Sequence, residues 1–201
     1  MPSIAREHGL PADRPPKILF CRTPRYMWPI LSEADNFLIP LGYLCLAAAL
    51  RESMPDVDIK LIDCPVEKLG WGSLEAIMRE WQPDMVCAGD EAIYVHETAK
   101  FFRTAKRANP ECITVGGGYT LPHVPEWSLG PGASDFLVFG EGEITFTELV
   151  KTLRFGGDLN TVSGLRFLGK SGEVVDTGFR PLIRNLDDLP MPAYDLMPRI
   201  S

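Results

Sequence analysis

The chain has 201 residues, of which 45% are hydrophobic and 23% charged, and its formal net charge is −7. This length allows one main hydrophobic core and excludes two large domains. The acidic balance, with Lys and Arg scattered along the chain, excludes the concentrated basic surface that a nucleic acid or an anionic membrane requires.

Cysteine and histidine usage points to a reducing compartment and away from a metal cluster. The five cysteines form no CxxC pair, and an odd count without a signal peptide predicts reduced thiols in the cytoplasm. The three histidines are far apart in the sequence. The longest apolar run, 37–50, is interrupted by Pro40 and Gly42 and is too short to cross a bilayer. We therefore expect no membrane span and no metal ligands in this chain.

From Lys17 onward, short β-rich apolar runs alternate with amphipathic stretches of helical length. This pattern is typical of βαβ units and predicts a flavodoxin-like (Rossmann-like) α/β fold, with a five-stranded parallel sheet and helices on both faces. Pro40 suits a first helical turn and Ser73 an N-cap. Strands are predicted over 17–22, 57–63, 84–90, 112–118 and 135–140, and helices over 40–53, 73–81, 92–108 and from about 143 to 153.

The ends of the chain follow other patterns. Residues 1–16 mix charge, Pro and Gly and predict a mobile leader before the α/β domain of 17–157. Residues 158–183 predict a small antiparallel β ribbon with a turn at 169–172, and 184–201 contain three prolines and predict a linker.

In a doubly wound sheet, ligands bind at the carboxyl ends of the strands. Glycine gathers at this predicted edge, where it lets a ligand approach the backbone. The run Gly116, Gly117 and Gly118 is the strongest signal, although it could also form only a tight turn. Gly140 and Gly142 flank Glu141 after the fifth strand, and Thr23 follows the first strand.

The usual occupants of such an edge need motifs that are missing. A dinucleotide needs GxGxxG after the first strand, where this chain reads RTPRYMW, and Thr23 alone does not make the phosphate loop of an FMN site. Asp90 sits where phospho-receiver domains have their phosphorylated aspartate. The acidic pair and the lysine that such domains also need are absent.

Five segments together resemble the N-terminal cobalamin-binding domain of radical S-adenosylmethionine enzymes, a group that includes anaerobic magnesium-protoporphyrin ester cyclase and several methyltransferases. They are PLGYLCLAAAL, PDMVCAGDEA, ITVGGGYT, FGEGEITFTEL and DLPMPAYDL, in this order. The similarity runs from about Lys17 to the end of the chain.

The resemblance implies that a corrin ring lies over the strand ends and that its nucleotide tail descends beside the sheet. Under the ring it places Gly89, Asp90, Glu91, Ala92 and Ile93; beside the tail Gly116, Gly117, Gly118, Tyr119 and Thr120; and at the far edge Gly140, Glu141 and Gly142. Thr23 and Gly42 complete the implied cofactor-binding set.

Two departures from related patterns are informative. Gly42 matches the glycine of the DxHxxG motif of other cobalamin carriers, but no histidine lies between His8 and His96. The resemblance therefore implies cobalt without a protein histidine below it. Tyr119 stands where the radical group often has Pro-His or His after the glycines.

The radical group holds its iron–sulfur cluster with CxxxCxxC after the DLPMPAYDL-like linker, and this chain does not contain that motif. We expect no catalytic residue here, with the cluster and S-adenosylmethionine bound by a radical domain of a longer chain or a separate partner. The expected function is to bind cobalamin for methyl transfer or oxidative cyclisation by the complete enzyme. The alternative is a cofactor-free docking module that keeps the fold.

Overall fold

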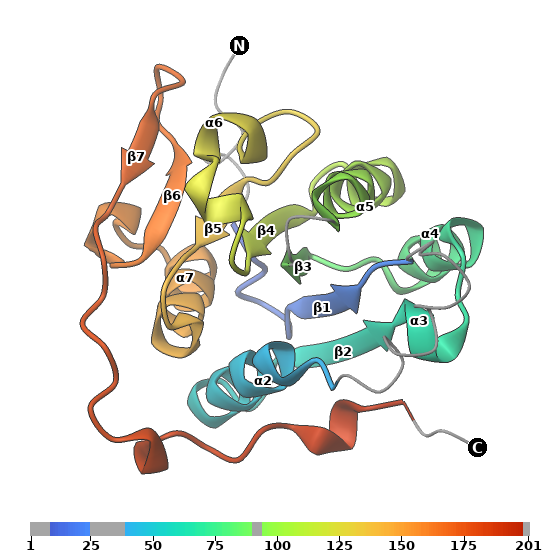
Figure 1. The fold of residues 1–201 in the computed structure, drawn as a ribbon, viewed down its shortest axis with the longest axis horizontal. Coiled ribbons are helices and arrows are strands. Elements are labelled where there is room, and N and C mark those ends of the chain that lie inside the picture. The colour runs from blue at the N-terminus through green and yellow to red at the C-terminus, as the bar shows by residue number, and fades with distance from the viewer. Residues whose placement is uncertain (1–8, 25–38, 90–93, 199–201) are drawn as a thin grey trace.

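The computed structural model describes residues 9–24, 39–89 and 94–198 (Figure 1). Its strands form one sheet in the order β2-β1-β3-β4-β5-β6-β7. Neighbours within the first five strands of this order are parallel. The order 2-1-3-4-5 is that of flavodoxin-like folds, so the predicted fold class is confirmed.

The predicted elements are present with small changes at their ends. The strands are β1 Lys17–Arg22, β2 Asp58–Asp63, β3 Met85–Gly89, β4 Ile113–Gly117, β5 Phe136–Val138, β6 Leu165–Leu168 and β7 Val174–Asp176. The helices are α2 Leu41–Ser53, α3 Cys64–Glu67, α4 Trp71–Trp81, α5 Val95–Ala108, α6 Pro125–Ser128 and α7 Gly142–Phe155, with single 3₁₀ turns at Leu121–His123, Leu159–Thr161, Leu186–Asp188 and Tyr194–Leu196.

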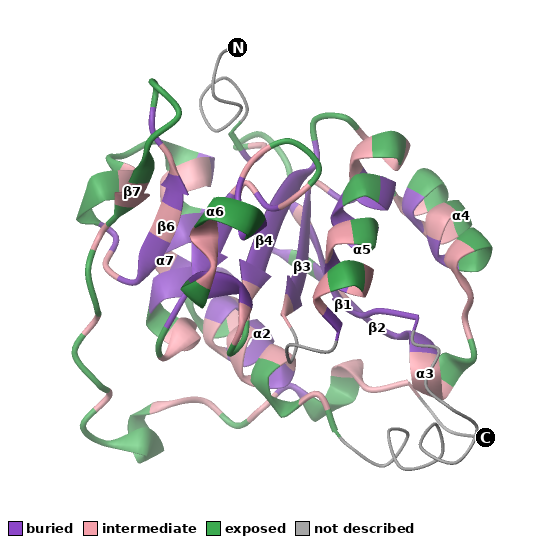
Figure 2. Cartoon of the chain, turned by 45° about the horizontal axis from the view of Figure 1, so that its top comes forward, coloured by how far each residue is buried: buried purple, intermediate pink, exposed green. Residues whose placement is uncertain are grey.

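The sheet separates two hydrophobic cores, as Figure 2 shows by the buried strands between half-buried helices. Because side chains of a strand alternate between faces, Ile18 and Phe20 of β1 pack on the side of α2 and α7. Leu19 and Cys21 pack on the side of α4 and α5. All four side chains are fully buried. Burial of an Ile, Leu or Phe side chain stabilises the fold by about 1.5–3 kcal/mol.

The start of α4 differs from the prediction. The helix begins at Trp71, and Gly70, in extended conformation, occupies the N-cap position. Ser73 therefore lies inside the helix, and its assignment as the N-cap was wrong. In α2 the helix begins at Leu41 after Pro40, within one residue of the predicted start.

The predicted ribbon is part of the main sheet. β6 pairs antiparallel with β5, and β7 pairs antiparallel with β6. Phe136 of β5 and Phe167 of β6 are partners in register, with ring centroids 6.0 Å apart. The turn forms where predicted, with the Gly172 amide donating to the Gly169 carbonyl at 3.1 Å. The result is a seven-stranded mixed sheet instead of a five-stranded sheet with a ribbon appended to it.

The described parts of both ends pack against the domain. Leu10 is buried and its amide donates to the Leu153 carbonyl at 2.9 Å, so the described part of the predicted leader contacts the domain. Ala193 is also buried, and its amide donates to the Leu44 carbonyl of α2 at 3.1 Å. The segment predicted as a linker thus lies along α2 (Figure 1).

None of the five cysteines forms a disulfide, and all but Cys45 are buried. Within the described ranges, no helix combines the length and the apolar character that crossing a membrane would require.

Candidate functional site

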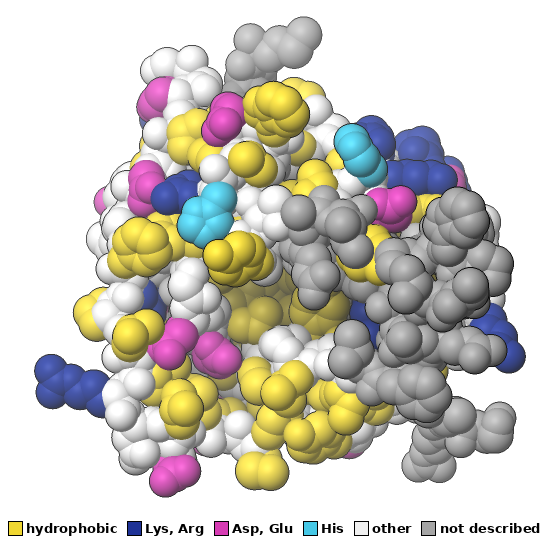
Figure 3. Space-filling view, in the orientation of Figure 1, with side chains coloured by type: hydrophobic (Ala, Val, Ile, Leu, Met, Phe, Trp, Pro, Cys, Tyr) yellow, Lys and Arg dark blue, Asp and Glu magenta, His cyan; other side chains and the backbone are white. Residues whose placement is uncertain are grey.

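A pocket of about 460 Å³ opens at the carboxyl edge of the sheet, beside the first turns of α2 and α7. In the space-filling view it is a hollow with hydrophobic side chains at its floor (Figure 3). It is lined by Arg22, Pro40, Leu41, Gly42, Tyr43, Leu46, Cys87, Ala88, Gly89, Val115, Gly116, Gly117, Gly118, Val138, Gly140, Glu141, Gly142, Glu143 and Phe146. The position is the one where doubly wound folds bind ligands.

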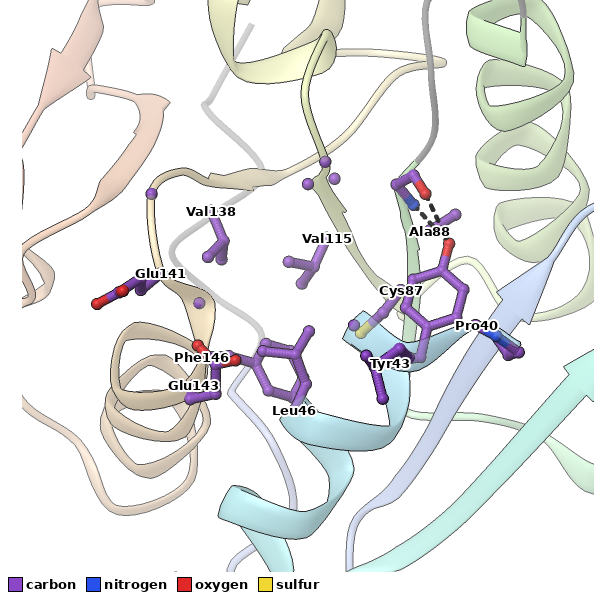
Figure 4. Close-up of a pocket in the computed structure, with 18 of the residues that line it drawn as sticks. Pro40, Tyr43, Leu46, Cys87, Ala88, Val115, Val138, Glu141, Glu143 and Phe146 are labelled. Carbon is purple, nitrogen blue, oxygen red and sulfur yellow. Dashed lines mark hydrogen bonds between the residues drawn. The ribbon is translucent and has the colours of Figure 1, made fainter. Parts of the chain in front are cut away.

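The inner walls of the pocket are apolar. Val115 of β4 and Val138 of β5 form the sheet side, and Leu46 of α2 and Phe146 of α7 form the helix side (Figure 4). Val115, Val138 and Phe146 are buried, and Leu46 is half-buried. Two apolar walls of this kind suit a flat aromatic group.

Tyr43 connects α2 to the end of β3. Its hydroxyl donates to the carbonyl oxygen of Gly89 and accepts from the amide of the same residue, both at 2.8 Å. Its ring stacks on Phe20, with centroids 5.8 Å apart. The last residue of β3 is thereby fixed at the edge of the pocket (Figure 4).

The glycines of the pocket serve different purposes. A Cβ on Gly89 would meet the backbone of Gly117 at 2.6 Å, so glycine is required there by the close approach of two strands. A Cβ on Gly117 would have nothing closer than the Val138 carbonyl at 3.7 Å. Gly118 follows the strand with φ +79°, a conformation that favours glycine. Gly117 therefore has room for a Cβ, whereas Gly89 does not.

Two charged side chains of the pocket, those of Arg22 and Glu141, are engaged with the protein. The Arg22 Nε donates to Asp63 Oδ1 at 2.9 Å, and both side chains are buried at the ends of β1 and β2. Glu141 occupies the N-cap position of α7 without capping it, and its carboxylate accepts a hydrogen bond from the Ile183 amide. Glu141 lines the pocket, and its carboxylate contacts the C-terminal segment.

Burial keeps the thiol of the pocket neutral. Cys87 points from β3 toward the pocket (Figure 4), and burial, with a smaller contribution from Cys112, raises its pKa well above the ordinary value. A neutral thiol is a poor metal ligand, because the thiolate is the binding form. The described residues contain no group of three or more His, Cys, Asp or Glu side chains placed to hold a metal ion.

The structure brings together most of the predicted site. Eight of the fifteen predicted residues line the pocket: Gly42, Gly89, Gly116, Gly117, Gly118, Gly140, Glu141 and Gly142. Four more, Asp90, Glu91, Ala92 and Ile93, lie outside the described residues.

The other three predicted residues do not line the pocket: Thr23, Tyr119 and Thr120. Thr23 is fully buried, and its hydroxyl has no hydrogen-bond partner among the described residues. Tyr119 is 84% exposed, and its ring lies 5.8 Å from that of His123.

The residues that form the apolar walls of the pocket were not predicted from the sequence. Tyr43 and Leu46 are three residues apart on one helix face, and Val115 and Gly117 are two apart on one strand face. These spacings could have assigned the four residues to a common side. Phe146 is four residues after Gly142, and this spacing likewise places both on one face of α7.

The strand order and the pocket at the carboxyl edge define a flavodoxin-like ligand-binding domain. A family model described as "B12 binding domain" matches residues 27–150, more than half of the chain. The chain therefore belongs to the B12-binding domain family, and the resemblance to the cobalamin-binding domain of radical S-adenosylmethionine enzymes is confirmed.

Curated relatives come from the same group. The chain is 34% identical over 160 residues to an uncharacterized methyltransferase of Pyrococcus horikoshii, covering 79% of this chain and 34% of the relative. It is 36% identical over 166 residues to hopanoid C-3 methylase of Methylococcus capsulatus, covering 80% of this chain and 30% of the relative. It is 28% identical over 153 residues to anaerobic magnesium-protoporphyrin IX monomethyl ester cyclase of Rubrivivax gelatinosus, covering 74% of this chain and 27% of the relative. The chain spans about a third of the length of these relatives.

Solved structures share the fold. OxsB, a cobalamin-dependent S-adenosylmethionine radical enzyme solved with aqua-cobalamin and S-adenosylmethionine, matches with a TM-score of 0.68 at 18% identity, over 92% of this chain and 25% of that one. TsrM, a radical S-adenosylmethionine methyltransferase from Kitasatospora setae, matches with a TM-score of 0.63 at 19% identity, over 81% of this chain and 30% of the TsrM chain.

Proposed function

We propose that this chain binds cobalamin at the described pocket and presents it to a radical S-adenosylmethionine domain. The observation that carries the proposal is an apolar pocket at the carboxyl edge of the sheet in a member of the B12-binding family. Family membership also favours this function over that of a cofactor-free docking module.

The residues present fit part of cobalamin. The pocket of about 460 Å³ suits an aromatic base with its sugar, whereas the whole cofactor is larger, so the corrin ring would lie outside the pocket at the strand ends. The flat space between Val115 and Val138 on one side and Leu46 and Phe146 on the other would hold the base. Gly117 leaves room for it, because no side chain extends there.

Gly89, Gly118 and Gly140 would lie at the rim, below the ring. Tyr43 would keep the end of β3 in place through its two hydrogen bonds to Gly89. When bound, cobalamin would supply a cobalt centre that can accept and donate a methyl group. The prediction that no protein histidine ligates this cobalt from below remains part of the proposal.

The complete enzyme is proposed to perform methyl transfer or oxidative cyclisation, as the names of the relatives suggest. Their greater length leaves room for a catalytic domain that binds the iron–sulfur cluster and S-adenosylmethionine. We propose that residues 184–201 lead toward that domain, and that the chain itself contributes no catalytic residue.

Retention of the cofactor tests the proposal. The purified chain is mixed with hydroxocobalamin and desalted, and the visible spectrum of the protein fraction is recorded. Corrin absorbance should elute with the protein in near-equal amount. A protein fraction without corrin absorbance would contradict cobalamin binding and favour the docking module.

A further inference from the structure

Two thiols meet where β1 ends and α3 begins. Cys21 lies near the end of β1, and Cys64 is the first residue of α3, directly after β2. The parallel register pairs Cys21 with Ile62, and side chains two residues apart along a strand share a face, so Cys64 lies on the same side as Cys21. The two Sγ atoms are 3.9 Å apart, although 43 positions separate the residues in the chain. The pairing of β1 with β2 therefore creates this contact.

The surroundings of the two thiols are closed and apolar. Cys21 is fully buried and Cys64 is 1% exposed, and both belong to the core that contains Leu19, Ile62 and Leu74. A metal ion between the sulfur atoms would need space and further ligands, and within the described ranges no group of three His, Cys, Asp or Glu side chains is placed to hold one. A disulfide needs no additional space, because its formation removes two hydrogen atoms and brings the sulfur atoms closer.

We propose that Cys21 and Cys64 are a site of reversible oxidation, at which a peroxide converts the two thiols into a disulfide. The sulfur atoms have to approach each other by about 2 Å to reach the length of a disulfide bond. Rotation about the Cα–Cβ bond of each cysteine can supply this movement. The bond would join the end of β1 to the start of α3, beside the ion pair of Asp63 with Arg22, and Arg22 lines the pocket. The proposal does not depend on cobalamin binding.

The oxidation balances with hydrogen peroxide as the electron acceptor. The thiolate of one cysteine attacks the peroxide, so that a sulfur–oxygen bond forms, the oxygen–oxygen bond breaks, and the released hydroxide takes a proton to become water. The second thiol then attacks the sulfenic sulfur, a sulfur–sulfur bond forms, and the sulfur–oxygen bond breaks to release a second water. The two sulfur atoms lose two electrons, which the two peroxide oxygens gain. A small-molecule thiol reverses the reaction by exchange, so the disulfide is transient in a reducing compartment.

Burial determines which oxidants reach the two thiols. The thiolate is the reactive form, and a buried thiol is reached only through local opening of the fold, so the oxidation should be slow and should accelerate as pH rises. Hydrogen peroxide is small and uncharged, whereas a bulky anionic disulfide reagent needs a wider opening. Cys45 is the one cysteine that is not buried, so the larger reagent should react there first.

The other three thiols lie elsewhere in the fold. Cys87 belongs to the core on the opposite face of the sheet, and Cys45 is part of α2, which packs on that opposite face. Cys112 directly precedes β4, at the amino edge of the sheet, and its thiol donates to the Ile113 carbonyl at 3.7 Å. The structure therefore predicts one specific disulfide and not a mixture.

The test treats the full 201-residue chain with hydrogen peroxide, in wild type and in a Cys45→Ser variant that lacks the one thiol that is not buried. After catalase has removed the peroxide and the remaining thiols are blocked under denaturing conditions, the intact mass and a non-reducing peptide map are recorded. We expect the loss of two hydrogen atoms per chain and a cross-linked peptide pair that contains Cys21 and Cys64, both reversed by dithiothreitol. The oxidised chain should melt about 5 °C or more above the reduced chain, because the bond closes a loop of 43 residues in the unfolded state.

Two serine variants locate the bond. Cys64→Ser should lose both the cross-link and the rise in melting temperature, whereas Cys112→Ser, at another buried cysteine of the same core, should keep both. A cross-link to a different cysteine, or oxygen added to Cys21 or Cys64 without a cross-link, would overturn the proposal. Two unmodified thiols at a peroxide dose that oxidises Cys45 in wild type would also overturn it and would show that the thiols only pack together. The peptide map of wild type decides between these outcomes even when a serine variant does not fold.

Discussion

The hydroxyl of Tyr43 satisfies both backbone polar groups of Gly89, at 2.8 Å each, and so joins the first turn of α2 to the last residue of β3. At this point β1 and β3 no longer pair, since their ladder ends at Phe20 and Cys87. A side chain thus replaces the missing strand neighbour at the switch point of the sheet.

The Tyr43→Phe variant should lower the free energy of unfolding by about 1–3 kcal/mol, because a partly buried amide and carbonyl lose their partner. Urea denaturation followed by circular dichroism measures this. Tyr119→Phe is the matched control, since Tyr119 is 84% exposed. Equal midpoints for the two variants would show that water replaces the Tyr43 hydroxyl without loss.

The Gly117→Leu variant should abolish cobalamin binding while the domain stays folded. Gly117 has no positive φ and has room for a Cβ, so the substitution does not strain the backbone. Because Val115 of the same strand faces the pocket, a side chain two residues later fills the same space. We expect at least about a tenfold loss of affinity, or 1.4 kcal/mol.

Titration with cobalamin, with melting temperatures recorded in parallel, makes the measurement. Gly72→Leu on the exposed side of α4 is the control, since a Cβ there meets nothing within 4 Å. Unchanged affinity in a folded Gly117→Leu protein would argue for a docking module or for a different binding site.

The sequence allowed the α/β fold to be predicted because each of its signals is local. A strand such as Lys17–Arg22 is a short apolar run, and the run Gly116–Gly118 marks the end of β4. The carboxyl edge then follows from the general rule for doubly wound sheets, and eight predicted residues line the pocket for this reason.

The rest depends on contacts between distant segments. Phe146 reaches the pocket because α7 packs beside α2, and Leu10 is buried because its amide meets the Leu153 carbonyl. Ser73 is a preferred N-cap residue type, whereas α4 begins two residues earlier, after Gly70. The burial of Leu10 is not encoded locally, since its partner Leu153 lies far along the chain.

Cys45 should be the first of the five thiols to react with iodoacetamide, because the others are buried. Burial, and next the negative charge of Glu143, raise the pKa of the Cys45 thiol. The thiolate is the reactive form, so the rate should still be rising above pH 9.

Glu143→Gln removes the charge and should lower the pKa of Cys45, moving the midpoint of the pH–rate profile to lower pH. Glu97→Gln on α5 serves as the control substitution. The Cys45→Ser variant should lose the fast phase. Identical profiles for wild type and Glu143→Gln would show that Glu143 does not act on this thiol.

The ion pair between Asp56 and Arg154 should make stability depend on pH. Arg154 donates two hydrogen bonds to the Asp56 carboxylate, at 2.6 and 2.9 Å, which together with the guanidinium charge holds the pKa of Asp56 below its usual value. A lowered folded-state pKa stabilises the protein above the unfolded-state pKa of about 3.9, and this contribution is lost as pH falls through the folded-state value.

The Asp56→Asn variant should therefore melt at a lower temperature than wild type at pH 7, and the two melting temperatures should converge toward pH 2.5. Asp58→Asn, at the exposed start of β2, controls for the loss of one negative charge. A difference that persists undiminished at pH 2.5 would assign the effect to packing of Arg154 instead of to the charge of Asp56.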